Sequence, residues 1–405
     1  MNTPSSELAK IVITGIVNAG KSSLINSIFE REISIVAPVE GTTTDAVTKR
    51  IELASAGPVT VVDTAGLDDK TELGALRIKK TLHEIETADI IILATPLNKA
   101  PTATEDEILL NAERQNKQIL ICATFADLPH DESKIKWLTD KSHIRTDNKE
   151  TNTAAEIRKK LITAAGKAEK EITPLEGIVH ENDHILLAVP LDLAAPKGRL
   201  ILPQIETIRD ALDRDCTISI AKDRELKQMY DNLVNKPDLV ITDSQTFSKT
   251  AADIDSNQKL TSFSILFARK KGDLSHYLKG LGAISKIQPK SKVMIVESCS
   301  HHKQPDDIGT VKIPRLFRQM IQSDTEFVFA HGLNESDDYT GISAAIICGG
   351  CMQTRRQMLS HLRRLEENNI PVTNYGIFLA YVNGLLPRAI EVFPDEYELY
   401  IETMK

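Results

Sequence analysis

Residues 11–22 read IVITGIVNAGKS, an apolar run that continues without a gap into the pattern G-x-x-x-x-G-K-[ST]. The apolar run predicts a β-strand, and Lys21 opens a predicted helix. In this setting the glycines let successive backbone N–H groups surround a phosphate, and the helix N-terminus adds positive potential. The context therefore favours a nucleotide phosphate site over a chance glycine-rich turn. The residues expected to line it are Gly15, Asn18, Ala19, Gly20, Lys21, Ser22 and Ser23.

Two of these side chains carry the expected chemistry. Lys21 should reach the β and γ phosphates, and the Ser22 hydroxyl should bind Mg²⁺. A second segment, DTAG at 63–66, follows the apolar run at 59–62. Its Asp63 carboxylate would therefore lie at the carboxyl end of a strand, where open α/β sheets bind ligands. Asp63 is expected to act on Mg²⁺, directly or through water, and the Gly66 N–H is expected to contact the γ phosphate.

A threonine-rich segment, GTTTD at 41–45, lies between these two motifs. The hydroxyls of Thr42 and Thr43 could complete the Mg²⁺ shell when a nucleoside triphosphate is bound. The alternative is a threonine-rich entry into a strand, because Thr also favours strands.

Strand-like and helix-like segments alternate outward from the phosphate motif. Further apolar runs at 90–93 and 119–122 are separated by helix-like segments, which predicts an α/β domain with a parallel-rich sheet and helices on both faces. Residues 140–153 are polar and irregular, and residues 159–170 predict a last helix. The first domain is therefore expected to span residues 1–170.

Two smaller α/β domains are predicted beyond it. Apolar runs at 185–189, 217–220 and 239–241 alternate with helix-like segments at 203–212, 223–234 and 243–252, which predicts a domain over 171–263. Runs at 293–296, 327–329 and 342–347, with an amphipathic helix at 354–367, predict a third domain over 264–405.

The overall composition excludes several classes of protein. With 41% hydrophobic and 26% charged residues in 405, the chain is neither disordered nor collagen-like. A net charge of -8 provides no general field for nucleic acid or an anionic membrane. The start MNTPSSELAK resembles no secretory signal, and no apolar run is long enough to span a bilayer. We therefore expect a soluble, cytoplasmic protein.

The cysteines fall into two groups. Cys122 and Cys216 stand alone and are expected to be small buried apolar residues. Cys299 follows the run at 293–296, and Cys348 and Cys351 form CGGC after the run at 342–347. Three thiolates at predicted strand ends suit a 4Fe-4S cluster or zinc. The alternative, a C-x-x-C redox pair, leaves Cys299 unexplained.

The order of the nucleotide motifs resembles the translation-factor class of GTPases, and GTTTD together with Asn18 resembles its Era and TrmE branch. The resemblance implies GTP hydrolysis in which Lys21, Asn18, Thr43, Asp63 and Gly66 take part, with Asn18 holding a stimulating K⁺ ion. Ras-like enzymes have a water-orienting Gln after DxxG. Leu67 stands there in this chain.

The base-recognition motif of that branch, N-K-x-D, is altered. Residues 123–127 read ATFAD, which keeps Asp127 but has Thr124 and Phe125 in place of Asn and Lys. A carboxylate can accept two hydrogen bonds from guanine, so Asp127 is expected to specify the base through its acceptor geometry. Phe125 could cover the ring by packing but lacks the charge of lysine. The expected S-A-K/L loop is not legible at 141–146, so the resemblance implies guanine preference with weakened affinity.

Five segments together resemble the FeFe-hydrogenase maturation GTPase family HydF: DDIGTVKIPR at 306–315, the pair CSHH and CGGCM, APKGRLILPQ at 195–204, and LTSFSILFAR at 260–269. The resemblance covers essentially the whole chain. It implies a GTPase domain, a dimerisation domain and a domain that binds a 4Fe-4S cluster. The implied function is a homodimeric scaffold that receives a diiron precursor from two radical-SAM maturases and transfers it to the apo form of FeFe-hydrogenase.

The cluster motif of this family, C-x-H followed by H-C-x-x-C, is matched in part. Cys299, His301, Cys348 and Cys351 are present, but Ile347 replaces the second histidine. The resemblance implies three cysteine ligands with His301 as a candidate fourth, and an exchangeable fourth position suits a scaffold. Two other functions remain as alternatives to the maturation scaffold. One is a tRNA-modifying or ribosome-assembly GTPase of the same branch, and the other is an electron-transfer iron-sulfur protein with a vestigial nucleotide site.

Overall fold

The computed structural model describes two compact units, residues 1–170 and 171–405, each considered by itself. Its described residues are 8–29, 47–53, 57–67, 74–115, 117–147, 151–167, 172–190, 200–297, 307–333, 338–350 and 353–405. Within these ranges, no helix combines the length and the apolar character needed to cross a membrane.

The first unit contains a mixed sheet with strand order β2-β3-β1-β4-β5-β6. Its neighbouring strands are parallel except for the antiparallel pair β2 and β3. This arrangement confirms the predicted α/β fold. The elements are β1 Ala9–Thr14, α1 Lys21–Phe29, β2 Val47–Glu52, β3 Pro58–Asp63, α2 Gly74–Glu86, β4 Ile90–Pro96, α3 Ala103–Arg114, β5 Gln118–Thr124, α4 Glu132–Leu138, β6 His143–Arg145 and α5 Thr151–Lys167.

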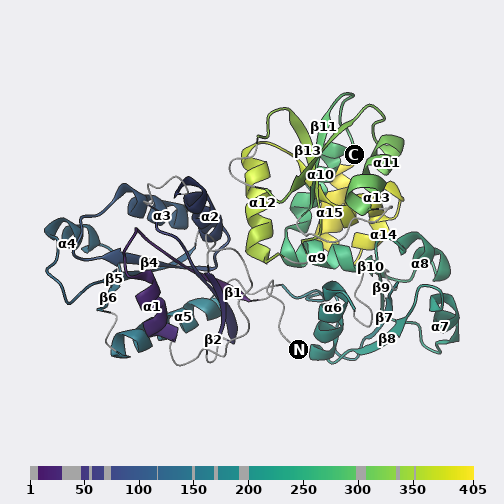
Figure 1. The fold of residues 1–405 in the computed structure, drawn as a ribbon. Coiled ribbons are helices and arrows are strands. Elements are labelled where there is room, and N and C mark those ends of the chain that lie inside the picture. Colours follow the sequence, from purple (N-terminus) through teal and green to yellow (C-terminus); the bar gives the residue numbers. More distant parts are fainter. Residues whose placement is uncertain are drawn as a thin grey trace. The chain divides into compact units, whose positions relative to one another are not determined.

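Helices cover both faces of this sheet, as the strand periodicity requires (Figure 1). Side chains alternate along β1, so Ile11 and Ile13 pack with α1 and α5, whereas Val12 packs on the opposite face with α2 and α3. The sheet is therefore a fully covered layer whose carboxyl ends hold the loops of interest.

The stretch predicted to be irregular contains a short strand. In β6 only Ile144 is buried, while His143 and Arg145 are partly or fully exposed at the edge of the sheet. Three residues with one apolar member give no periodic signal, which explains why sequence reasoning missed this strand.

Two parallel sheets form the second unit. The first has strand order β10-β9-β7-β8, and the second has order β12-β11-β13-β14. Their elements are β7 His184–Ala188, α6 Leu202–Asp213, β8 Thr217–Ala221, α7 Leu226–Asn232, β9 Leu239–Thr242, α8 Phe247–Asp253, β10 Leu260–Ser262, α9 Phe263–Lys271, α10 Leu274–Ile284, β11 Lys292–Glu297, a π-helix Ile308–Lys312, α11 Ile313–Met320, β12 Glu326–His331, β13 Ile342–Ile347, α12 Arg355–Glu367, β14 Val372–Asn374, α13 Tyr375–Val382, α14 Leu386–Ile390 and α15 Pro394–Thr403.

One hydrophobic core joins the two sheets of this unit. It includes Leu186 of β7, Phe263 of α9 and Val296 of β11, and it uses one face of β11. The other face, through Val293 and Ile295, packs with α11 and α13 in a separate core. The expected boundary between residues 263 and 264 falls in the first turn of α9. The division of residues 171–405 into two domains therefore remains a prediction.

Candidate functional site

The phosphate motif forms the loop between β1 and α1, and its backbone conformation requires glycine. Gly15 has φ 149°, and a Cβ atom there would lie 2.2 Å from the backbone oxygen of Ala94 on β4. Gly20 has φ 82°, and Asn18 also lies in the left-handed region at φ 58°. Asn is one of the few residue types that adopt this conformation readily. These residues tolerate the required backbone angles, so the loop can lie close against the sheet.

The Lys21 ammonium lies inside this loop. Its Nζ donates hydrogen bonds to the backbone oxygens of Gly15 at 3.3 Å and Ile16 at 2.8 Å, and the residue is 9% exposed. A buried ammonium held by loop carbonyls is placed where a bound polyphosphate would meet it.

Asp63 and Ser22 converge at the neighbouring strand end. Asp63 pairs in register with Ile13 on β1, and the Ser22 Oγ donates to the Asp63 Oδ2 at 3.1 Å. Burial raises the pKa of Asp63 above its ordinary value. The Ser22 hydrogen bond and the charge of Lys21 oppose that rise.

A desolvated carboxylate beside a hydroxyl is a suitable donor pair for Mg²⁺. The chemistry of Ser22 and Asp63 therefore fits the predicted magnesium site. The other predicted donors, Thr42 and Thr43, lie outside the described residues.

The DTAG segment lies directly against the phosphate loop. A Cβ atom at Gly66 would lie 2.4 Å from the Val17 Cγ2 and 2.6 Å from the Val17 nitrogen, so only glycine fits. The next N–H, that of Leu67, donates to the Gly15 oxygen at 3.3 Å. The Leu67 side chain is buried among apolar residues of α2 and α3, so it does not orient water as a glutamine would.

The altered base-recognition segment is also tied to the phosphate loop. The buried Thr124 donates from Oγ1 to the Ala19 oxygen at 2.8 Å. Phe125 follows with φ 57°, and Asp127 lies in the turn after it and is exposed. The sequence analysis did not predict this contact of Thr124. The replacement of the motif's asparagine by Thr124 was the feature of the sequence that could have indicated it.

The second loop expected around the base could not be read from the sequence, but its place in the fold is clear. Thr146, directly after β6, donates its N–H to the Ala123 oxygen at 2.8 Å and accepts from the Ala126 N–H at 3.3 Å. Thr146 thus joins the end of β6 to the segment that contains Asp127.

The CGGC segment begins at the carboxyl edge of a different sheet, the one that contains β11 and β13. Cys348 directly follows β13 and is partly exposed, and its N–H donates to the Val296 oxygen of β11 at 2.9 Å. The strand ends that lead into CGGC and toward Cys299 are therefore adjacent. Cys299, His301 and Cys351 lie outside the described residues, and the described ranges alone contain no group of three or more His, Cys, Asp or Glu that could hold a metal ion. Cys122 and Cys216 are buried, as predicted.

A buried carboxylate at the same edge was not predicted. Glu297, the last residue of β11, is 6% exposed, and its Oε1 has no hydrogen-bond partner within the described ranges. A Cβ atom at Gly309 would lie 2.4 Å from both this Oε1 and the Tyr375 hydroxyl. Gly309 belongs to the DDIGTVK segment, so the close approach explains a glycine there. A glutamate at a strand end ordinarily suggests an exposed side chain, which is why the sequence did not reveal it.

Comparisons with known families match most of the chain in three separate parts. Residues 10–125 match the family described as 50S ribosome-binding GTPase. Residues 175–272 match the Hydrogen maturase F dimerization domain, and residues 275–392 match the Hydrogen maturase F tetramerization domain.

Two curated relatives match parts of the chain. The tRNA modification GTPase MnmE of Herminiimonas arsenicoxydans is 36% identical over 102 residues, which cover 24% of this chain and 22% of the relative. MnmE of Paraburkholderia xenovorans is 29% identical over 229 residues, which cover 52% of this chain and 49% of the relative. The chain thus spans between about a fifth and a half of the length of these relatives.

Two solved structures are similar to parts of the chain. The G domain of the T. maritima iron transporter FeoB has 18% identity and a TM-score of 0.30, covering 39% of this chain and 99% of that one. Era in complex with MgGDPNP and nucleotides of 16S ribosomal RNA has 20% identity and a TM-score of 0.31, covering 39% and 56%.

Proposed function

Since the chain belongs to the hydrogen maturase F family, we propose that it is a GTP-hydrolysing scaffold that carries a 4Fe-4S cluster and delivers the diiron subcluster of FeFe-hydrogenase. One observation carries the proposal. The chain matches two maturase domains, and it also has a GTPase domain. In that domain the Ser22 Oγ lies 3.1 Å from the Asp63 Oδ2, beside the buried Lys21.

The nucleotide reaction is phosphoryl transfer from GTP to water. Lys21 and the loop N–H groups bind the phosphates and stabilise the charge that develops on them. Ser22 and Asp63, with Thr43, would hold Mg²⁺, and the Gly66 N–H would bind the γ phosphate. Asn18 would hold a K⁺ ion beside the phosphates, which supplies positive charge where Leu67 supplies no water-orienting group.

The cluster would be held at the carboxyl edge of the sheet that contains β11 and β13. Its ligands would be the thiolates of Cys299, Cys348 and Cys351. Two observations support this site: Cys348 is joined to the end of β11 by a 2.9 Å backbone hydrogen bond, and the buried Glu297 presents an oxygen without a partner in the described residues. His301 and Glu297 are the candidates for the fourth position, because the buried Ile347 offers no donor. When bound, the cluster supplies an iron to which a second iron unit can attach through a bridging ligand.

The partners follow from the family. We propose a homodimer that interacts with radical-SAM maturases and with apo FeFe-hydrogenase in the cytoplasm, without a membrane or nucleic-acid partner. The net charge of -8 supports this choice, because nucleic-acid binding is driven by positive charge.

A tRNA-modification function is the main alternative. It is favoured by the MnmE relatives, but their alignments with this chain cover half of those proteins or less. Neither maturase domain match is explained by it.

The test is anaerobic reconstitution with iron and sulfide, followed by loading with a diiron precursor and incubation with apo-hydrogenase. Hydrogen evolution is the expected result, and GTP turnover should be faster in K⁺ than in Na⁺. Reconstituted protein that binds no cluster and activates no hydrogenase would contradict the proposal. Stimulation of its GTP turnover by tRNA would favour the alternative.

A further inference from the structure

The base-recognition segment lacks a cation at a position where the branch expects one. Phe125 occupies the place of the motif's lysine, and its φ of 57° fixes an unusual backbone at that point. The neighbouring Thr124 still reaches the phosphate loop through the Ala19 oxygen. The segment therefore contacts the phosphate loop through Thr124 and contributes no positive charge to it.

A lysine from the adjacent loop lies on the phosphate loop instead. Lys99 follows β4, is exposed, and directs its Nζ to the backbone oxygen of Val17 at 3.5 Å. Val17 lies between Gly15 and Asn18, within the phosphate motif. The turn that carries Lys99 is attached to the base-recognition segment, because the Leu97 N–H donates to the Thr124 oxygen at 2.9 Å.

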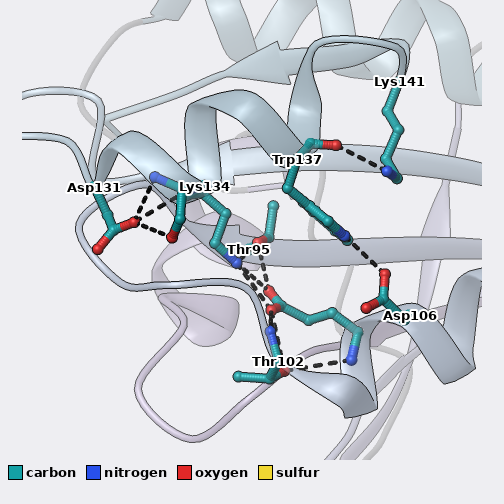
Figure 2. Close-up of polar contacts among 9 residues, drawn as sticks. Thr95, Thr102, Asp106, Asp131, Lys134, Trp137 and Lys141 are labelled. Atoms are coloured by element: carbon teal, nitrogen blue, oxygen red, sulfur yellow. Dashed lines mark hydrogen bonds and ion pairs between the residues drawn. The ribbon is translucent and has the colours of Figure 1, made fainter.

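This turn is held by a fully buried ion pair. The side chains of Glu105 on α3 and Lys134 on α4 both have 0% exposure. Figure 2 shows the Lys134 side chain pointing toward Thr95. The Lys134 Nζ donates to the two carboxylate oxygens of Glu105 at 2.9 and 2.8 Å, and to the Thr95 Oγ1 at 2.9 Å. Its three donors are thus all used.

The ion pair joins both ends of the turn. Thr95 precedes the turn at the end of β4, and Thr102 follows it as the N-cap of α3. The Glu105 carboxylate accepts from the Thr102 N–H at 2.8 Å and from its hydroxyl at 3.0 Å, in a capping box. Within the turn, the Leu97 oxygen accepts from the Asp131 N–H at 2.8 Å.

A buried ion pair adds little net stability, because the loss of hydration offsets the attraction between the charges. Its value here is geometric: it sets the direction in which the turn at 96–102 presents Lys99. The ammonium then lies beside the loop that would surround the phosphates, where positive charge favours a bound polyphosphate.

We propose that Lys99 is a nucleotide-binding residue that supplies the positive charge missing at Phe125, and that the Glu105–Lys134 pair positions it. The inference deepens the proposed function and rests on GTP binding at the phosphate loop.

The experiment measures the Kd of fluorescent GTP and GDP analogues for the full chain. Lys99→Met should raise both Kd values by about tenfold while kcat at saturation changes less than about twofold, because the lost contact is the same in the ground and transition states. Lys136→Met is the matched control, since Lys136 is exposed on α4 and contacts no phosphate-loop residue in the part of the chain that the structure describes. Its Kd values should equal those of the wild type.

A rescue variant separates this role from a structural one. Adding Phe125→Lys to Lys99→Met restores the lysine at its usual place, so it should recover most of the lost affinity. An unchanged Kd in Lys99→Met, or no recovery in the double variant, overturns the proposal. Absence of GTP binding in the wild-type chain would instead overturn the proposed function.

The positioning role is tested by replacing both charges at once. Glu105→Gln with Lys134→Met leaves no uncompensated buried charge. This variant should weaken nucleotide binding by a similar factor, and adding Lys99→Met should cause little further loss. Fully additive losses would show that the pair does not act through Lys99. If the charge-free variant fails to fold, Lys99→Met and its rescue still decide the role of Lys99.

Discussion

The phosphate edge of the first sheet and the cysteine edge of the sheet around β11 use the same topological position in different ways. Both lie at the carboxyl ends of parallel strands. The phosphate edge is made chiefly of backbone groups from one loop, with Gly15 pressed onto β4 and Gly66 onto Val17. The cysteine edge is made of side chains from separate elements, such as Glu297, Cys348 and Tyr375.

The difference shows how each kind of site can be recognised from a sequence. A site made of consecutive N–H groups needs particular residues in one short run, so its motif is contiguous and specific. A site made of side chains from several strands needs only one or two residues from each. Its parts are separated by about fifty residues here, and they acquire meaning only when the topology brings the strand ends together.

The strongest test of this comparison removes the phosphate contact alone. Lys21→Ala should lower GTP hydrolysis by at least about 100-fold, the scale of losing one preorganised charge contact in a transition state. Iron content after reconstitution should stay unchanged, since the cysteine edge lies in the other compact unit. The measurements are phosphate release and iron analysis of the same sample. A parallel loss of iron would mean that the two edges are not separable.

The reciprocal change removes a thiolate. Cys348→Ala should eliminate the visible absorption of the reconstituted cluster and leave the GTP turnover within about twofold of the wild type. Cys299→Ala and Cys351→Ala are expected to behave in the same way. Any one of these variants that keeps the full spectrum removes its residue from the ligand set.

Glycine substitutions compare how rigid the two edges are. Gly15→Ala would place a Cβ atom 2.2 Å from a backbone oxygen, so we expect a loss of about 2 to 3 kcal/mol in the free energy of unfolding and no GTP binding. Gly309→Ala meets the ends of two side chains at 2.4 Å, which can move, and should cost about 1 kcal/mol. Denaturant titrations of both variants provide the measurement. Equal losses would argue against the distinction between backbone and side-chain construction.

The smallest expected effect concerns two thiols: Cys122, in the sheet that forms the phosphate edge, and Cys348, at the cysteine edge. Burial raises the pKa of Cys122 from 9.0 to about 12; the charge of Lys160 lowers this pKa and the charge of Glu156 raises it, each by less than burial does. Iodoacetamide at pH 8 should therefore leave Cys122 unmodified in the native, cluster-free protein, while the partly exposed Cys348 reacts. Mass spectrometry of the two peptides checks this, and rapid native labelling of Cys122 would contradict it.

The same shift has a defined sign for stability. Because the folded pKa exceeds the unfolded one, the folded state keeps a proton that the unfolded state releases. The contribution of Cys122 is complete below pH 9.0 and is lost as the pH rises toward about 12. The free energy of unfolding should therefore fall more steeply in this range for the wild type than for Cys122→Ala.

Much of the fold and of the phosphate site could be predicted from local pattern. The alternation of apolar runs with helix-like segments predicted the covered sheet around β1, and the glycine positions predicted the loop at Gly15 and Gly20. Both follow from constraints that act within a few residues, namely side-chain period and allowed φ. The strand β6 escaped prediction because its neighbours, and not its own composition, place it in the sheet.

The remaining features depend on contacts between distant segments. Nothing in the sequence near Glu105 indicates that Lys134, twenty-nine residues later, neutralises it in the core. Glu297 and Gly309 likewise acquire their relation only through the fold. Thr124 and Phe125 could be recognised as departures from a motif, but only the structure shows that one of them still holds the phosphate loop.

The hydrophobic core that the two sheets of residues 171–405 share has a mechanical consequence. Leu186, Phe263 and Val296 share one apolar interior, so neither sheet can tilt without carrying its neighbour along. A displacement of one sheet would therefore also move the cysteine edge of the other sheet. Cutting the chain at residue 263 would expose that interior to water and yield fragments prone to aggregate.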